Sequence, residues 1–149
     1  MASIGPDSAL DDGFHRYRRY LPHWRAPGAT YAVVWKLYEY QPLLGPPERT
    51  MTVSALRHFD GVRYDLLAYV VMPDHVHALV RPRGAFKLHE IVHSWKSFTA
   101  RVLQRDHGRR GRIWLTDYYN RIVRDEREYR DTATYIVGNP AESWPEITS

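Results

Sequence analysis

The chain has 149 residues, a formal net charge of +4 and no cysteine. A chain of this length fits one compact domain that can fold without disulfide bonds, and the lack of cysteine excludes thiol nucleophiles and cysteine-ligated zinc sites. No apolar stretch reaches the roughly 20 residues that cross a bilayer. The lack of cysteine fits a cytoplasmic protein, and we expect no membrane partner. Arginine, which suits phosphate groups, supplies most of the positive charge, so a nucleic-acid partner is one interpretation of the composition and an ordinary solvated basic surface is the other.

The first third of the chain predicts a loosely attached start, one strand and one helix. Residues 1–14 contain aspartates and no apolar block, so we expect a flexible N-terminal arm rather than a signal peptide, and a single domain over residues 15–149. The basic, aromatic and proline-broken segment up to residue 29 predicts an irregular loop. Residues 30–40 are rich in β-formers and predict a strand, and residues 49–61 predict a modest helix.

The middle of the chain predicts two tightly joined strands. Residues 62–72 and 75–83 are both strongly apolar, and Pro73 and Asp74 between them form a turn signal. Strands joined by so short a turn must be antiparallel neighbours.

The remaining elements are two helices that flank an extended segment. Residues 87–108 predict the clearest helix, with an apolar stripe at a spacing of 3.6 residues; the stripe consists of Leu88, Ile91, Val92, Trp95, Phe98, Val102 and Leu103. Residues 109–125 predict a short strand pair or an extended segment, and residues 125–140 a last helix. The order βαββαβ predicts an α+β fold, a ferredoxin- or RRM-like antiparallel sheet with helices on one face, followed by an additional C-terminal helix that carries a tyrosine.

Two histidines, His75 and His77, lie one residue apart in the second of the joined strands. Alternate residues of a strand point to the same face, about 7 Å apart, so both imidazoles can reach one metal ion. A pair of half-buried histidines bonded to the backbone is the alternative interpretation of this spacing. Two ligands leave a metal site incomplete, so a third ligand must come from another segment.

The last helix offers that ligand. Tyr135 and Asn139 are four residues apart and share a helical face, and Asn139 falls in the last turn, where the helix dipole favours a cation. His75, His77 and Asn139 would form a mixed nitrogen and oxygen site that suits Mg²⁺ or Mn²⁺. Tyr135 then lies one turn from the metal as a candidate nucleophile toward a phosphate; an ordinary aromatic residue at a helix edge is the alternative.

Four segments in a fixed order carry a resemblance to a known family: "RRYLPHWRAPGATYAVVWKL", "HSWKSFTARVL", "YYNRIVRDEREYR" and "YIVGNP". Together they resemble the REP-associated tyrosine transposases, relatives of the insertion-sequence tyrosine transposases, over residues 18–140. "PDHVHALV" also resembles the HUH signature (histidine, hydrophobic residue, histidine) of single-strand DNA nucleases and transposases.

The resemblance implies a metal-dependent endonuclease and transposase that cleaves and rejoins single-stranded DNA next to palindromic, REP-like hairpins through a 5′-phosphotyrosine intermediate. It places the nucleophile at Tyr135 and the divalent-metal ligands, for Mg²⁺ or Mn²⁺, at His75, His77 and Asn139. It further implies a ferredoxin- or RRM-like fold, a bacterial, nucleoid-associated location in the cytoplasm, and a monomer or homodimer. The chain departs from the family at Asp74, where an asparagine is expected, and after Pro140, where "AESWPEITS" replaces the residues of a longer tail.

Three segments are candidates for DNA contacts. The resemblance implies that Arg18, Arg19 and Trp24 help to read the foot of the hairpin.

The other candidates come from the predicted helix at 87–108 and the segment after it. Lys96 and Arg101 lie off the apolar stripe of the helix and are candidates for phosphate contacts, with a solvated helix face as the alternative. Tyr119, Arg121 and Arg124 suggest a strand edge that meets DNA, with the tyrosine stacked on a base; the alternative is a tyrosine that packs in the core.

Two other functions remain open at this point. The same fold could be a non-catalytic, regulatory module that binds hairpin nucleic acid on its basic surface, or a metal-dependent hydrolase in which water rather than Tyr135 attacks. The covalent DNA adduct that Tyr135 would form separates the enzyme from both alternatives.

Overall fold

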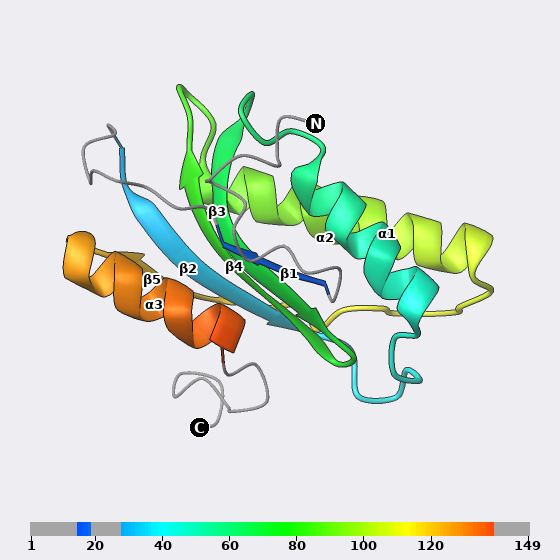
Figure 1. Ribbon diagram of the computed structural model, residues 1–149. Helices are drawn as coiled ribbons and strands as arrows, with labels where there is room; N and C mark the ends of the chain where they lie inside the picture. The colour runs from blue at the N-terminus through cyan, green and yellow to red at the C-terminus, as the bar shows by residue number, and fades with distance from the viewer. Residues whose placement is uncertain (1–14, 19–27, 139–149) are drawn as a thin grey trace.

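The computed structural model describes residues 15–18 and 28–138. A five-stranded antiparallel sheet in the order β1-β3-β4-β2-β5 forms its centre (Figure 1). The strands are β1 Arg16–Arg18, β2 Thr30–Lys36, β3 Tyr64–Met72, β4 His75–Pro82 and β5 Tyr119–Val123. The helices are α1 Pro46–Arg57, α2 Leu88–Asp106 and α3 Glu126–Gly138.

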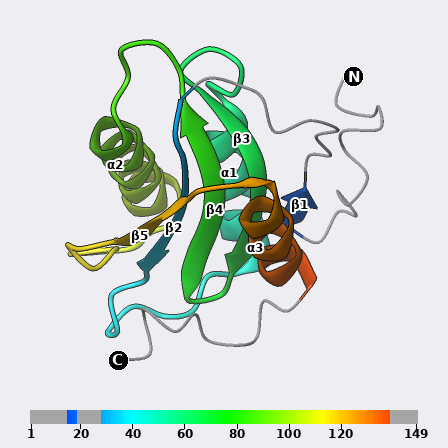
Figure 2. The same cartoon turned by 90° about the vertical axis from the view of Figure 1, so that its left-hand side faces the viewer.

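The predicted α+β fold with an antiparallel sheet is confirmed, and the helices divide between its two faces. Figure 2 shows α1 and α2 on one side of the sheet and α3 on the other. The largest boundary differences from the prediction are in the first third of the chain: the first predicted strand ends at Lys36, and the first helix spans Pro46–Arg57 instead of residues 49–61. A proline at the first helical position costs little, because its missing N–H would have no helical partner there, and the Glu48 carboxylate accepts a hydrogen bond from the Gly45 N–H at 2.8 Å.

The strand β1 was not predicted. It lies in the segment whose prolines predict an irregular loop, and it pairs with β3 at the edge of the sheet. Three residues are too few to show a periodic pattern, so tertiary pairing rather than local preference defines this strand.

The face covered by α1 and α2 holds the larger hydrophobic core. Trp35 of β2 is fully buried there, stacked on Trp95 of α2 at 5.7 Å between ring centroids and in edge contact with Trp114 at 6.1 Å. The Trp95 indole N–H donates to the Tyr64 hydroxyl at 2.9 Å, and this hydroxyl donates to the Leu56 carbonyl at 2.5 Å. The polar groups of Trp95 and Tyr64 are therefore bonded within this core, whereas the Trp35 indole N–H has no hydrogen-bond partner among the described residues.

The apolar stripe predicted for α2 is confirmed apart from one position. Phe98 is 45% exposed, whereas Thr99 beside it is fully buried. The Thr99 hydroxyl donates to the Trp95 carbonyl at 2.8 Å and accepts the Trp114 indole N–H at 2.9 Å. These two hydrogen bonds allow a polar residue to occupy the core position that the pattern gave to phenylalanine.

The face covered by α3 holds a smaller core. The buried side of α3 contains Tyr129, Ala133, Ile136 and Val137, which pack on β-strand residues that include Val34, Val70 and Leu79. Asp125 precedes the helix and accepts the Glu128 N–H at 2.9 Å. The Arg16 guanidinium of β1 donates to the Val137 carbonyl in the last turn at 3.2 Å, so both ends of the helix are bonded.

Several predictions fall outside the described residues: the N-terminal arm, Arg19, Trp24 and Asn139. Within the described ranges, none of the helices has the length and apolar character needed to cross a membrane.

Candidate metal and nucleophile site

The two histidines of β4 share the α3 face of the sheet. Alternation in β4 turns Val76 and Ala78 into the core under α1 and α2, and His75 and His77 toward the opposite side. His77 lies between Val34 of β2 and Val70 of β3, both of which belong to the core under α3. The predicted same-face arrangement is therefore present in a central strand that is paired on both sides.

His77 lies at the border between this core and the predicted site. The residue is 4% exposed, and burial, together with the smaller effects of the nearby His75 and Arg121, lowers the pKa of its imidazole from 6.5 to about 3. His77 is therefore neutral at physiological pH, the protonation state that a metal-bound imidazole requires.

His75 has a defined partner at the turn before the strand. Its Nδ1 lies 2.8 Å from Oδ1 of Asp74, and its side chain is 17% exposed against 62% for Asp74. An ionised carboxylate accepts hydrogen bonds and cannot donate them, so this contact favours a proton on Nδ1 of His75.

Tyr135 lies against His77. The two rings are 6.1 Å apart between centroids at an interplanar angle of 76°, an edge-to-face contact. The tyrosine is half-buried, one residue before Ile136, which is fully buried under the sheet. The structure thus brings Tyr135, the predicted nucleophile, beside His77, a predicted metal ligand, although the two residues are 58 positions apart in the sequence.

Two of the three predicted metal ligands, His75 and His77, lie within the described residues, and their role as ligands stays a prediction. Two imidazoles on one face, one neutral through burial and one with Nδ1 engaged by a carboxylate, match the state in which histidine binds metal, with a second partner that fixes the ring. No group of three histidine, cysteine, aspartate or glutamate side chains suited to a metal ion occurs among residues 15–18 and 28–138. A third ligand from Asn139, just beyond α3, remains a prediction.

Two of the predicted DNA contacts lie on the same face as the histidines. Tyr119 of β5 is paired with Val34, which is paired in turn with His77, so the tyrosine lies two strands away, roughly 10 Å across the sheet. Arg121 follows on the same face, is exposed, and is close enough for its charge to lower the His77 pKa. Arg124, also exposed, follows β5, and its backbone N–H donates to Glu128 at 2.6 Å.

Lys96 and Arg101 lie on α2, on the other side of the sheet, and do not join this site. The Lys96 ammonium donates to the carbonyls of Leu115 and Thr116, at 2.8 Å each, and burial lowers its pKa. Lys96 therefore fixes the segment before β5 to α2, a role that a sequence pattern does not show.

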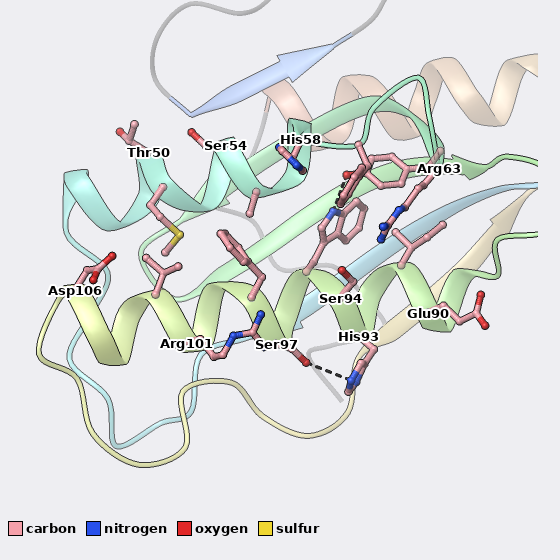
Figure 3. A pocket seen from close by; sticks show the side chains of 18 of the residues that line it. Thr50, Ser54, His58, Arg63, Glu90, His93, Ser94, Ser97, Arg101 and Asp106 are labelled. Carbon is pink, nitrogen blue, oxygen red and sulfur yellow. Dashed lines mark hydrogen bonds between the residues drawn. The ribbon is translucent and has the colours of Figure 1, made fainter.

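Arg101 lines a groove between α1 and α2 (Figure 3). The groove has a volume of about 1380 Å³, and its lining combines apolar residues such as Met51 and Phe98 with polar residues such as His93 and Ser97. It lies on the α1 and α2 side of the sheet, whereas the two histidines and Tyr135 lie on the α3 side.

Two residues of the site were missed by the sequence analysis. The Arg16 guanidinium donates a hydrogen bond to the last turn of α3. Lys36 is paired with His75 across the β2–β4 ladder and lies on the same face. The position of Lys36 follows from strand alternation once β2 is paired with β4, but no local signal connects Arg16 with residue 137.

Comparisons with known proteins identify a family for this chain. The family model described as "Transposase IS200 like" matches residues 29–139. No match was found among the curated proteins.

Two solved structures share the fold. A REP-associated tyrosine transposase bound to a REP hairpin has a TM-score of 0.63 and 20% sequence identity over 81% of this chain and 72% of its own. A protein described as a "putative transposase" from Deinococcus radiodurans R1 has a TM-score of 0.57 and 18% identity over 83% of this chain and 99% of its own. The family model covers well over half of the chain, from β2 to the end of α3 and including both histidines and the tyrosine, and the chain therefore belongs to the IS200-like transposase family.

Proposed function

We propose that this protein is a metal-dependent single-strand DNA endonuclease and transposase that cleaves and rejoins DNA next to hairpins through Tyr135. The observation that carries the proposal is the contact between Tyr135 and His77, with ring centroids 6.1 Å apart, on the face where His75 also lies. Membership of the IS200-like family supports the reaction class, and the REP hairpin bound by the structural neighbour supports the kind of substrate.

The proposed metal ligands are His75, His77 and Asn139. A bound Mg²⁺ or Mn²⁺ ion would polarise a phosphoryl oxygen of the scissile phosphate. Burial keeps His77 neutral down to a pH of about 3, so loss of activity in mild acid should arise from groups other than this ligand.

Tyr135 supplies the nucleophile in the proposed reaction. Its hydroxyl oxygen forms a bond to phosphorus, the bond from phosphorus to the 3′ oxygen breaks, and the freed oxygen takes up a proton as a 3′-OH while the tyrosine proton passes to solvent. The phosphotyrosine keeps the number of phosphate ester bonds constant. Attack by a 3′-OH therefore reverses the step and rejoins the strand without an added energy source.

The single-stranded DNA would approach the site over β5. Tyr119 is 41% exposed on the face of the two histidines, and an exposed aromatic ring can stack on a base while an arginine contacts phosphate. We assign Tyr119, Arg121 and Arg124 to this part of the substrate. Arg18, Arg19 and Trp24 remain our candidates for the foot of the hairpin.

The test is a covalent adduct. A REP-like hairpin oligonucleotide with a single-stranded flank, incubated with the protein and Mn²⁺, should give a protein–DNA band that resists denaturing electrophoresis. Tyr135→Phe should abolish the band, whereas the matched control Tyr40→Phe, at a tyrosine that is 79% exposed, should retain it. An adduct that persists in Tyr135→Phe would contradict the proposal.

The same assay separates the alternatives. Cleaved DNA without an adduct would instead support hydrolysis by water. Salt-dependent binding without cleavage, unaffected by chelator and by Tyr135→Phe, would support a non-catalytic hairpin-binding module.

A further inference from the structure

The carboxylate of Asp74 faces one ring nitrogen of His75 and leaves the other available. Oδ1 of Asp74 lies 2.8 Å from Nδ1 of His75. A neutral imidazole carries one proton, and the carboxylate accepts it through Nδ1, so Nε2 keeps its lone pair. A partner of this kind fixes both the tautomer and the ring direction of a metal-binding histidine.

The backbone around Asp74 is held in place although its side chain is 62% exposed. Asp74 and Pro73 form the turn between β3 and β4, and both carbonyls of the turn accept hydrogen bonds from the loop after β2. The Leu44 N–H donates to the Pro73 carbonyl at 2.9 Å, and the Leu37 N–H donates to the Asp74 carbonyl at 2.8 Å. Proline also restricts its own φ angle, so the turn presents the carboxylate to His75 from a fixed backbone.

We propose that Asp74 is a positioning residue that holds His75 as the Nδ1–H tautomer and directs Nε2 toward the metal ion. This inference rests on the proposed function, which assigns His75 as a ligand. The alternative role for the carboxylate is direct binding of the metal, and one of its two oxygens, Oδ1, is engaged by the imidazole.

The tautomer can be measured without metal or DNA. Nitrogen-15 chemical shifts of the histidine rings at pH 8, where an ordinary imidazole is neutral, distinguish a protonated ring nitrogen from a bare one. We expect the proton of His75 on Nδ1 in the natural protein and a shift of population toward Nε2–H in Asp74→Ala. A natural protein with the His75 proton on Nε2 would overturn the proposal.

Metal affinity gives a second, independent readout. Calorimetric titration with Mn²⁺ in the absence of DNA should show a loss of about 10- to 100-fold in Asp74→Ala, the usual effect of removing the partner of a metal-binding histidine. Asp74→Asn keeps an oxygen that can accept the Nδ1 proton and should retain most of the affinity. Glu39→Gln, which removes an exposed carboxylate from the loop after β2, is the matched charge control and should bind as the natural protein does.

The variants separate positioning from direct ligation. If Asp74→Asn loses as much affinity as Asp74→Ala, the carboxylate itself binds the metal and the positioning role is wrong; unchanged affinity in both variants overturns it as well. Neither measurement contains DNA, so failure of the adduct assay would remove the proposed function and leave the tautomer and the Mn²⁺ affinities as separate results.

Discussion

The two faces of the sheet differ in what their polar atoms do. Under α1 and α2, the buried polar groups of Trp95 and Tyr64 bond within the core, in a series that ends at the Leu56 carbonyl. Under α3, the same strands place His75, His77 and Arg121 around a smaller apolar core.

The central strand β4 shows the division most clearly. Val76, Ala78 and Val80 turn to the first face and are fully buried, and the histidines alternate with them. Because side chains of a strand alternate with a period of two, one strand stabilises the fold with one set of residues and presents reactive groups with the other. The two sets can therefore be changed separately.

The largest expected loss of stability comes from a change in the core under α1 and α2. Trp35→Ala removes a fully buried ring between Trp95 and Trp114 and should lower the free energy of unfolding by about 3–5 kcal/mol, measured by urea denaturation. Molecules that remain folded should keep their Mn²⁺ affinity. Val62→Ala, at a residue that is 65% exposed, is the control and should change stability by less than about 0.5 kcal/mol. A comparable effect of both variants would contradict the assignment of the main core.

The second largest loss of stability is expected for the ion pair that joins α1 to the segment just after α2. Arg109 is 7% exposed in its side chain and donates to Glu48 at 2.6 and 2.8 Å, so Arg109→Met should cost about 3 kcal/mol at pH 7. Arg109 holds the pKa of Glu48 below its ordinary value. The stabilisation is therefore present above the ordinary glutamate pKa and is lost as the pH falls through the lower, folded-state value.

Denaturation at pH 7 and at pH 3 measures this dependence. The difference between the natural protein and Arg109→Met should shrink at the lower pH, whereas Arg110→Met, at the exposed neighbouring arginine, should have little effect at either pH. A difference that stays constant with pH would show that the Glu48 charge contributes little.

The stability of the metal-free protein should depend on pH through His77. The folded-state pKa of His77 is about 3 against 6.5 for an ordinary histidine. The unfolded chain thus gains a proton first, and stability is lost as the pH falls from about 6.5 toward 3. His77→Leu removes this titration. When the pH falls from 8 to 5, the free energy of unfolding of the natural protein should therefore drop by about 2 kcal/mol more than that of His77→Leu. Urea denaturation in the presence of chelator measures it, and equal pH dependence in both proteins would refute the burial of His77.

The smallest effect on stability is expected for the hydrogen bond between Arg16 and the last turn of α3. Arg16→Met removes the bond to the Val137 carbonyl and should cost about 0.3–1 kcal/mol, because the cation stabilises the negative end of the helix dipole. The adduct assay should nevertheless slow, since Tyr135 lies two residues before Val137. Arg130→Met, which breaks a surface ion pair with Glu126 on the same helix, should cost a similar amount of stability and leave the rate unchanged. Equal rates in both variants would contradict a role for Arg16 in placing the tyrosine.

The sequence predicted those features that repeat along an element. The period of α2 identified its buried side apart from Phe98, and the alternation in β4 placed His75 and His77 on one face. The resemblance linked His77 and Tyr135, which no local pattern connects, and their rings lie 6.1 Å apart, while their roles stay predictions.

Features that depend on contacts between distant segments were not predicted. The strand β1 exists through its pairing with β3, and Lys96 points its ammonium to the carbonyls of Leu115 and Thr116 rather than to solvent. Thr99 replaces Phe98 in the core because Trp114, 15 residues away, supplies its hydrogen-bond donor. Such partners are brought together by the fold, and single-element patterns contain no information about them.

The pairing of β4 on both edges has a consequence for the lifetime of the site. The backbone amides of the two histidines lie in a strand bonded to β2 and β3, and we expect them to exchange with solvent only through global unfolding. The helix α3 is held by side-chain packing and the Arg16 bond, so its amides should exchange through smaller, local openings. The histidines would then stay fixed through many cycles in which the helix, and the tyrosine with it, detaches and returns.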